Sequence, residues 1–242
     1  MPCGALWPAR RKKNDQTRTE EGTFWRTTVI ETDTRLRIAR GIGKSEKEAS
    51  SEAFRQLKQR GHPDTPPPLV SDGCEGITVA LVGVYGQVPR YSGRGRPPKK
   101  KRAGEGWQYL QLVKQRNEHG AVIAAEPRVV FGDEEQVLAL GCSTAYVERT
   151  HLTSRQMNRR LARKSLGFSK KLQAHRAACI FEDGIYNFVR PLKSLREEVN
   201  PQAGCFEQRW EKRTPAMAAG LTNHVWNVKE LLKTIAVPIN NT

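Results

Sequence analysis

The chain has 242 residues with 41 Lys and Arg against 25 Asp and Glu, which gives a formal net charge of +16 at pH 7. This length allows one ordinary domain with an insertion or a small appendage, and a hydrophobic fraction of 37% allows a real core. The sequence contains no run of about 18 apolar residues, which argues against a membrane span. The positive charge indicates a polyanionic partner, most often nucleic acid.

The first regular structure that the sequence predicts is a β-hairpin, which follows a basic and polar lead-in over residues 1–22. Residues 23–30 are rich in β-branched and aromatic side chains, and residues 35–39 alternate polar and apolar positions. The four residues between them supply turn chemistry. We therefore expect two strands with one buried face.

A helix, a strand and a second helix are expected next. Ser45 and Glu48 form a capping box, in which the serine oxygen and the glutamate carboxylate cover free amide donors. Gly61 ends this helix, a short apolar strand ends at Asp72, and residues 77–84 form the following helix. Alternation of this kind predicts a mixed sheet with helices packed on it.

The middle of the chain begins with a loop of Gly, Pro and basic residues over 92–106. Two interpretations of its lysines stay open, a solvated loop and a contact to the DNA backbone. Two strands (107–113 and 121–130) and a short helix through Leu140 are expected to follow.

The last part of the chain is expected to be helical. We expect a long basic helix over about residues 153–166 and a second helix over about 170–189. We expect one or two short helices in the tail between residues 209 and 235.

Two carboxylates are candidates for chemistry. Asp72 ends an apolar strand, and open α/β sheets hold their sites at the carboxyl edge. Glu148 stands at the entry to the basic helix, and seven residues later Arg155 returns to nearly the same helix face, with Arg159 one turn further on. A carboxylate there suits a divalent cation and the arginines suit a phosphate. The alternatives are an ordinary Asp-Gly turn and a glutamate that favours the helix dipole.

Other site chemistries find no support in the sequence. The five cysteines are scattered without a CxxC pair, so no zinc site is indicated, and free thiols in a reducing cytoplasm are expected. Neither a Cys/His nucleophile signature, a P-loop nor a dinucleotide fingerprint is present.

Several segments together resemble DDE-type transposases of the first insertion-sequence family, over roughly residues 4–235. Residues 146–153 and 158–170 resemble the helix that carries the catalytic glutamate, and residues 68–73 resemble the strand with the second catalytic aspartate. Residues 186–196 resemble the motif that follows, and residues 213–226 the C-terminal signature.

The resemblance implies an α/β fold of ribonuclease-H-like type, a mixed sheet with helices, a β-rich insertion and a C-terminal helical tail. It divides the chain into a first part of the core (1–91), a basic loop and β-rich insertion (92–142), the catalytic-Glu helix with the following core helix (143–191), and a tail (192–242). It also implies a prokaryotic, nucleoid-associated cytoplasmic protein without membrane contact, which acts on element ends and target DNA, with a homo-oligomer as a possible state.

The same resemblance implies the site. Three carboxylates in this family hold two Mg²⁺ (or Mn²⁺) ions, which activate a water or a 3′-hydroxyl for in-line attack on a DNA phosphate. By position, Asp72 is the second carboxylate and Glu148 the third, so both are expected as catalytic residues and metal ligands. The residues expected to contact DNA are Lys99, Lys100, Lys101, Arg149, Arg155, Arg159, Arg160, Arg163 and Lys164.

The first carboxylate is missing from this pattern. Family members carry an aspartate on the first strand before Glu, an aliphatic residue and Trp, and here Gly4 stands at that position before Ala5, Leu6 and Trp7. Asp33 is a poor substitute because it falls in the hairpin turn. The family's N-terminal DNA-binding region is missing as well, so we expect a truncated or decayed copy, or one with a misassigned start. Strand transfer is expected at background level with DNA binding retained; the alternative is an inert DNA-binding remnant that competes with intact transposase.

Overall fold

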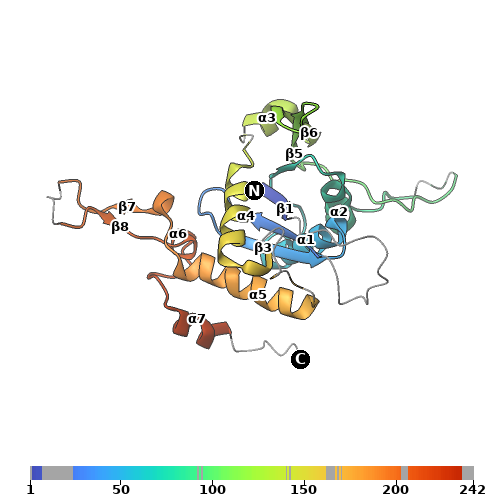
Figure 1. Cartoon of the computed structure of the whole chain (residues 1–242). Helices are drawn as coiled ribbons and strands as arrows, with labels where there is room; N and C mark the ends of the chain where they lie inside the picture. The colour runs from blue at the N-terminus through green and yellow to red at the C-terminus, as the bar shows by residue number, and fades with distance from the viewer. Residues whose placement is uncertain are drawn as a thin grey trace.

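The protein is described by a computed structural model over residues 2–6 and 24–235, apart from residues 92, 94, 140, 142, 162–166, 168, 170 and 203–206, with the backbone alone for residues 2–6 and 235. A mixed sheet with helices on both faces forms its centre (Figure 1). The six strands are β1 (Pro2–Leu6), β2 (Trp25–Ile30), β3 (Arg37–Gly43), β4 (Leu69–Asp72), β5 (Tyr109–Arg116) and β6 (Val122–Phe131). The chain is therefore of mixed α/β class, as the sequence predicts.

The strands lie in the order β3-β2-β1-β4-β5-β6. Strand β2 is antiparallel to both of its neighbours, while β1, β4 and β5 run parallel to one another, and β6 returns antiparallel to β5. The parallel pairs require crossover connections, which helices supply. Strands β5 and β6, which lie within the expected basic loop and β-rich insertion (92–142), thus extend the same sheet as residues 2–72.

The helices follow the expected alternation. They are α1 (Glu46–Arg60), α2 (Glu75–Tyr85), α3 (Glu134–Ala139), α4 (Ala145–Met157), α5 (Leu172–Gly184), α6 (Pro215–Ala218) and α7 (Val228–Ile235). A π-helical turn, Ile185–Val189, prolongs α5, and 3-10 turns lie at Arg159–Leu161 and Lys193–Leu195. Strands β7 (Glu197–Glu198) and β8 (Trp210–Glu211) form a small separate hairpin.

Helix α1 begins as its capping residues predict. The Ser45 hydroxyl accepts a hydrogen bond from the Glu48 amide at 3.2 Å, whereas the Glu48 carboxylate covers the amide of Lys44 at 2.8 Å, one residue before the expected donor. The helix lies directly on β3, since a Cβ at Gly41 would stand 1.8 Å from the carbonyl oxygen of Ala49. Glycine is therefore required there for the close approach.

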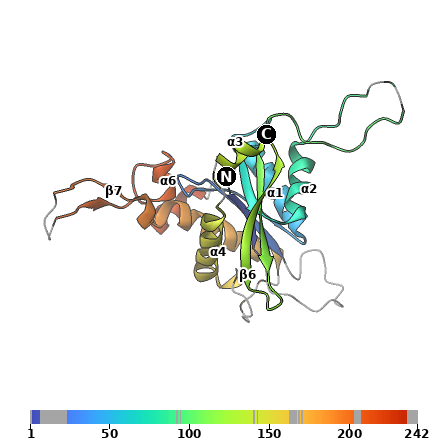
Figure 2. The same ribbon diagram turned by 90° about the horizontal axis from the view of Figure 1, so that it is seen from above.

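The two faces of the sheet are covered by different helices (Figure 2). On one face, Phe54 and Leu57 of α1 and Ile77 and Leu81 of α2 pack with Val29 in the main core. On the other face α4 contacts β1 and β2, and α5 is joined to β2 by a buried ion pair from Arg26. Alternation along β2 explains the division, since Arg26 and Val29 point to opposite sides.

Helix α4 corrects one expectation. The sequence predicted a helix over about residues 153–166, but α4 begins at Ala145 and ends at Met157. Its buried stripe, Val147, Thr150, His151 and Ser154, has helical spacing but is mostly polar, so an apolar pattern does not reveal it. The helix ends because Asn158 is extended and its side chain accepts from the amide of Arg160 at 3.1 Å, which competes with helix hydrogen bonding.

Two arms leave the body of the protein. The segment between α2 and β5, which includes the basic loop, projects on one side, and the β7–β8 hairpin projects on the other (Figures 1 and 2). Within the described ranges, none of the helices combines the length and the apolar character that a membrane crossing requires.

Candidate functional site

Asp72 lies at the carboxyl end of β4, in register with Leu112 on β5. One of its carboxylate oxygens, Oδ1, is buried and has no hydrogen-bond partner among the described residues. Burial raises the pKa of Asp72 to about 6, the nearby carboxylate of Glu46 adds to the rise, and Lys114 opposes it. The carboxyl is therefore poorly solvated and lies within the field of a lysine.

Lys114 follows Leu112 by two positions on β5, so it projects to the same side of the sheet as Leu112 and Asp72. Its ammonium group forms an ion pair with the carboxylate of Glu148 in the first turn of α4. The Glu148 side chain is 55% exposed and that of Lys114 33%. One lysine thus stands between the two carboxylates that the sequence singled out, and it acts on both.

The position of the missing carboxylate is adjacent. Strand β1 lies between β2 and β4, with Cys3 in register with Ser71. One residue further along both parallel strands, Gly4 comes beside Asp72, on the same side of the sheet by alternation. Helix α4 contacts β1 as well. Positions 4 and 72 are therefore neighbours on the face of the sheet that α4 covers, and the first of them carries no side chain. Asp33 lies in the turn between β2 and β3, as expected.

The donor set decides which metal chemistry is feasible. Two Mg²⁺ ions between them need several anionic oxygen ligands, whereas Asp72 and Glu148 are two, and Lys114 already neutralises one of them. Throughout the described ranges no group of three or more His, Cys, Asp and Glu could hold a metal ion. These residues do not fit a two-metal centre, because a cation of the protein itself stands at their junction.

Another pair of carboxylates, Glu182 and Asp183, is buried and forms ion pairs that hold the elements of the fold together. Glu182 accepts from Arg26 at 2.6 Å, from Arg37 at 2.5 Å and from Ser154 at 2.6 Å, and its neighbour Asp183 accepts from Arg37 at 2.9 Å. Burial alone would raise the pKa of each carboxyl, but Arg26 and Arg37 outweigh it and hold both pKa values below the ordinary range. This network joins β2, β3 and α4 to α5, and its carboxylates are buried and occupied by the arginines.

The basic residues expected to contact DNA fall into two regions. Arg149 and Arg155 lie on α4, and Arg159 and Arg160 lie in the 3-10 turn after it, so Arg159 does not continue the helical face of Glu148 and Arg155 as expected. Arg163 and Lys164 lie outside the described residues.

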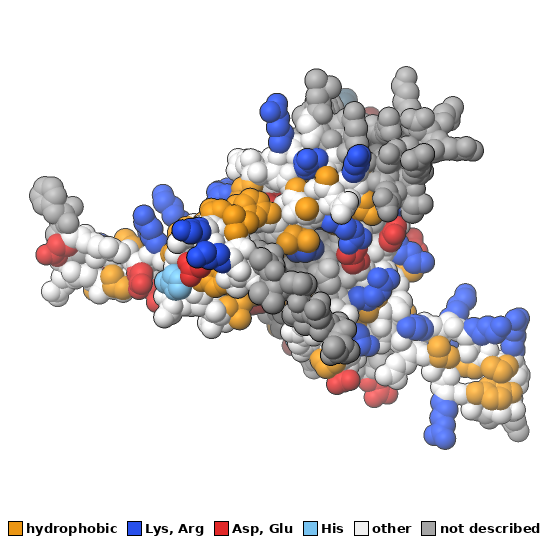
Figure 3. Space-filling model, turned by 90° about the horizontal axis from the view of Figure 1, so that it is seen from below, with side chains coloured by type: hydrophobic (Ala, Val, Ile, Leu, Met, Phe, Trp, Pro, Cys, Tyr) orange, Lys and Arg blue, Asp and Glu red, His pale blue; other side chains and the backbone are white. Residues whose placement is uncertain are grey.

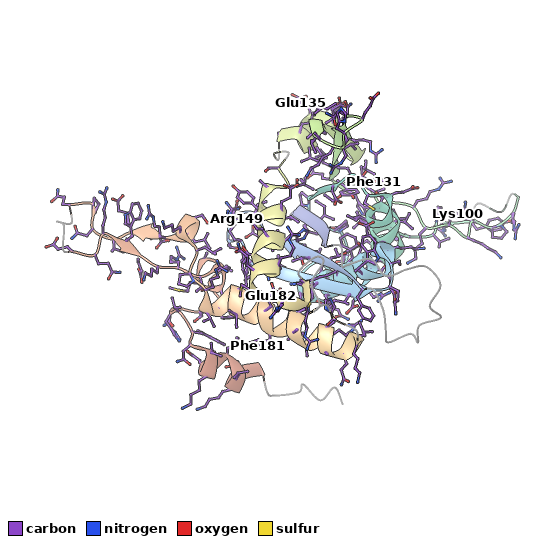
Figure 4. The ribbon with its side chains drawn as sticks, in the orientation of Figure 1. Lys100, Phe131, Glu135, Arg149, Phe181 and Glu182 are labelled. Carbon is purple, nitrogen blue, oxygen red and sulfur yellow. The ribbon has the colours of Figure 1, made fainter. Side chains whose placement is uncertain are left out.

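The second region is the projecting loop. Lys99, Lys100 and Lys101 lie there, and Lys101 donates to the carbonyl of Gly83 at 2.7 Å. Figure 4 places Lys100 and Arg149 on opposite sides of the protein. Seen from below, Lys and Arg gather on the loop, whereas Asp and Glu are interspersed with them over the rest of that face (Figure 3). Those of the expected DNA contacts that the structure describes therefore fall into separate regions.

Lys114 is the site residue that the sequence did not reveal. A lysine near the end of a strand is ordinary, and its role follows from the parallel pairing of β4 with β5, which connects segments some forty residues apart. The alternation Leu110, Leu112, Lys114 is the available signal, since it assigns the lysine to the face of two buried leucines.

Comparison with known proteins adds no relative: neither a protein-family model, a curated protein nor a solved structure matches the chain. The function has to be argued from the motifs, the fold and the site.

Proposed function

We propose that the protein is a transposase-like DNA-binding protein of the DDE type whose centre for DNA cleavage and strand transfer is inactive. The proposal associates it with the DNA of a prokaryotic cell, where it binds element ends and competes with intact transposase.

The strand arrangement supports this proposal. An antiparallel β1-β2-β3 unit followed by the parallel strands β4 and β5, with α1 and α2 as the crossovers, fits a ribonuclease-H-like core. Fold alone does not establish function, so the site has to carry the proposal.

The observation that carries it is the position of Lys114. Its ion pair with Glu148 and its field at Asp72 join the second and third carboxylates of the motif across β5 and α4. The ammonium replaces positive charge that a metal ion would otherwise supply, and Gly4 stands where the first carboxylate of the motif is expected. Because a metal pair contributes several kcal/mol to stabilisation of the transition state, we expect cleavage near the uncatalysed rate.

DNA binding does not depend on that chemistry. The net charge of +16, the exposed Arg149 of α4 and the exposed lysines of the basic loop supply phosphate contacts. Each neutralised phosphate releases a counterion, so affinity has to fall steeply as salt rises.

The test of this binding is fluorescence anisotropy with a labelled DNA duplex over a series of KCl concentrations. We expect a linear fall of log affinity against log salt, with a slope of about 0.9 for each phosphate contacted. A duplex of the same sequence with an uncharged backbone is the matched control and should not bind. Equal affinity for the two duplexes, or affinity independent of salt, would contradict the proposal.

A further inference from the structure

A cavity of about 610 Å³ lies beside α4, on the helix face next to that of Glu148. It is open to solvent and is lined by α4, the turn between β2 and β3, and residues 190–194 after the π-helical turn. In Figure 4 Arg149 marks this side, since it points from α4 away from β5 and toward the C-terminal arm. Pockets for small ligands have volumes of about 300–1,000 Å³, so the cavity has the size for one such group.

The charge of the cavity has one sign. Its lining includes the cations Arg35, Arg149, Arg190 and Lys193 and no carboxylate. None of these four cations forms an ion pair with a described residue, whereas the buried arginines Arg26 and Arg37 are paired with carboxylates. Like charges around one space repel, and an anion bound among them relieves that repulsion.

Arg35 is held in a strained conformation at this place. Its φ of 61° is the one positive value among the described non-glycine residues. Such a conformation costs on the order of 1 kcal/mol for a side chain of this kind. It brings the guanidinium carbon to 3.3 Å from the ring centroid of Tyr146, at the wall of the cavity. Backbone conformations of this kind cluster at functional sites, so the position of Arg35 supports a binding role for the cavity.

The rest of the lining includes apolar and hydroxyl side chains. Ile30, Pro191 and Leu192 are apolar, and Thr153 and Ser194 supply hydroxyl groups. We propose that the cavity binds a nucleotide, with its phosphate among Arg35, Arg149, Arg190 and Lys193 and its base against the apolar wall. Guanidinium groups suit this role because they form paired hydrogen bonds to phosphate oxygens.

The nucleotide has two possible sources with the same chemistry. One is a free nucleoside monophosphate, and the other is an unpaired nucleotide at the end of a DNA strand. The second source rests on the proposed function, and it gives the cavity a role there, because Arg149 directly follows Glu148 and a strand held in the cavity would pass the candidate site.

The test uses the full chain and the variant Arg190→Ala/Lys193→Ala. Both side chains are exposed, so folding should be retained. The matched control, Lys212→Ala/Lys229→Ala, removes the same charge from exposed positions outside the cavity. Isothermal titration calorimetry measures binding of a nucleoside monophosphate and of the nucleoside without phosphate. Anisotropy compares a blunt duplex with one that has unpaired ends.

We expect the wild type and the control to bind the monophosphate and the nucleoside to bind at least roughly tenfold more weakly, since a charge-assisted hydrogen bond is lost. The cavity variant should lose about tenfold or more in affinity for the monophosphate, and any preference for unpaired ends should disappear with it. A preference for unpaired ends in the wild type assigns the site to DNA strands, and its absence assigns it to the free nucleotide.

Equal binding of the monophosphate by the cavity variant and the control, or no binding by the wild type, would overturn the inference. If the inference fails in this way but duplex binding still falls steeply with salt, the proposed function is unaffected. If the wild type binds the monophosphate but no duplex, and the cavity variant loses monophosphate binding, the inference about the cavity is supported and the proposed function is contradicted.

Discussion

Lys114 on β5 forms an ion pair with Glu148 on α4, at the point where the sheet and the helix approach each other. The pair is partly exposed, so it contributes at most about 1 kcal/mol to stability. Its importance is chemical, because the lysine also lies within the field of Asp72 and gives the site a positive charge of its own.

Replacement of Lys114 by Met should create a weak metal site. Asp72 and Glu148 then lose the cation that opposes their repulsion, and one divalent ion takes its place. We expect millimolar Mn²⁺ to raise the melting temperature of this variant by a few degrees and that of the wild type not at all, because a ligand that binds only the folded state stabilises it. Differential scanning calorimetry measures the shift. The double variant Lys114→Met/Asp72→Asn is the control, and a shift that survives in it would show that the metal binds elsewhere.

Asp72 should make the protein less stable as pH rises. Its pKa is about 6 in the folded protein against an ordinary 3.8, so the folded state holds this proton more tightly than the unfolded state. The free energy of unfolding therefore falls between about pH 4 and pH 6 and stays lower above it, by roughly 2 kcal/mol. Urea unfolding across this range should show the fall in the wild type and a smaller one in Asp72→Asn. Equal pH profiles for the two proteins would contradict the assigned burial of the carboxyl.

The buried network should be the most sensitive part of the fold. Glu182→Gln leaves Arg26 and Arg37 without half of their compensation, and breaking a buried pair costs about 3–5 kcal/mol. The pKa of Glu182 is lowered in the folded state, so the stability that its ionisation provides is present above the ordinary value of 4.5 and is lost as pH falls below it. Denaturant unfolding near pH 7 measures the loss.

The matched control for this variant is Glu198→Gln. Glu198 pairs with Arg209 on the projecting hairpin, where the two side chains are 32% and 52% exposed. Removal of that pair should cost less than about 1 kcal/mol. Similar losses of unfolding free energy in the two variants would mean that the Glu182 ion pairs are accessible to water.

The basic loop should contribute to DNA affinity without supporting the fold. The variant Lys99→Ala/Lys100→Ala/Lys101→Ala should reduce the salt slope of DNA binding by about 1 for each lysine that contacts a phosphate. Its melting temperature should stay close to that of the wild type, because all three side chains are exposed and the variant loses one exposed hydrogen bond, from Lys101 to the carbonyl of Gly83. The variant Lys212→Ala/Lys229→Ala/Lys233→Ala removes the same charge from the tail. If both variants change the slope equally, the loop has no special contact with DNA.

The strands and helices that carry local signals could be predicted from the sequence. The β2–β3 hairpin and the cap of α1 depend on residues close together in the chain, and both were confirmed. Helix α4 was misplaced because its buried face is made of Thr150, His151 and Ser154, and Ser154 is hydrogen-bonded to Arg37 and Glu182. Polar residues that are buried in a network do not produce an apolar stripe.

The site was predictable only in part, for a related reason. Asp72 and Glu148 stand out because each has a recognisable position at the end of a strand or the start of a helix. Lys114 and the cavity around Arg35 depend on tertiary pairing, which brings together β4 with β5 and the β2–β3 turn with α4. The alternation along β5 assigns Lys114 to one face of the sheet, but it does not say which residues lie opposite.

The most direct measurement is metal-dependent nicking of supercoiled plasmid DNA by the wild type and by Glu148→Gln, at a protein concentration where both bind the DNA. We expect both proteins to leave the plasmid intact at the background rate in Mg²⁺ and in Mn²⁺. Nicking by the wild type that Glu148→Gln abolishes would show that the carboxylates at positions 72 and 148 do assemble an active centre despite Gly4 and Lys114.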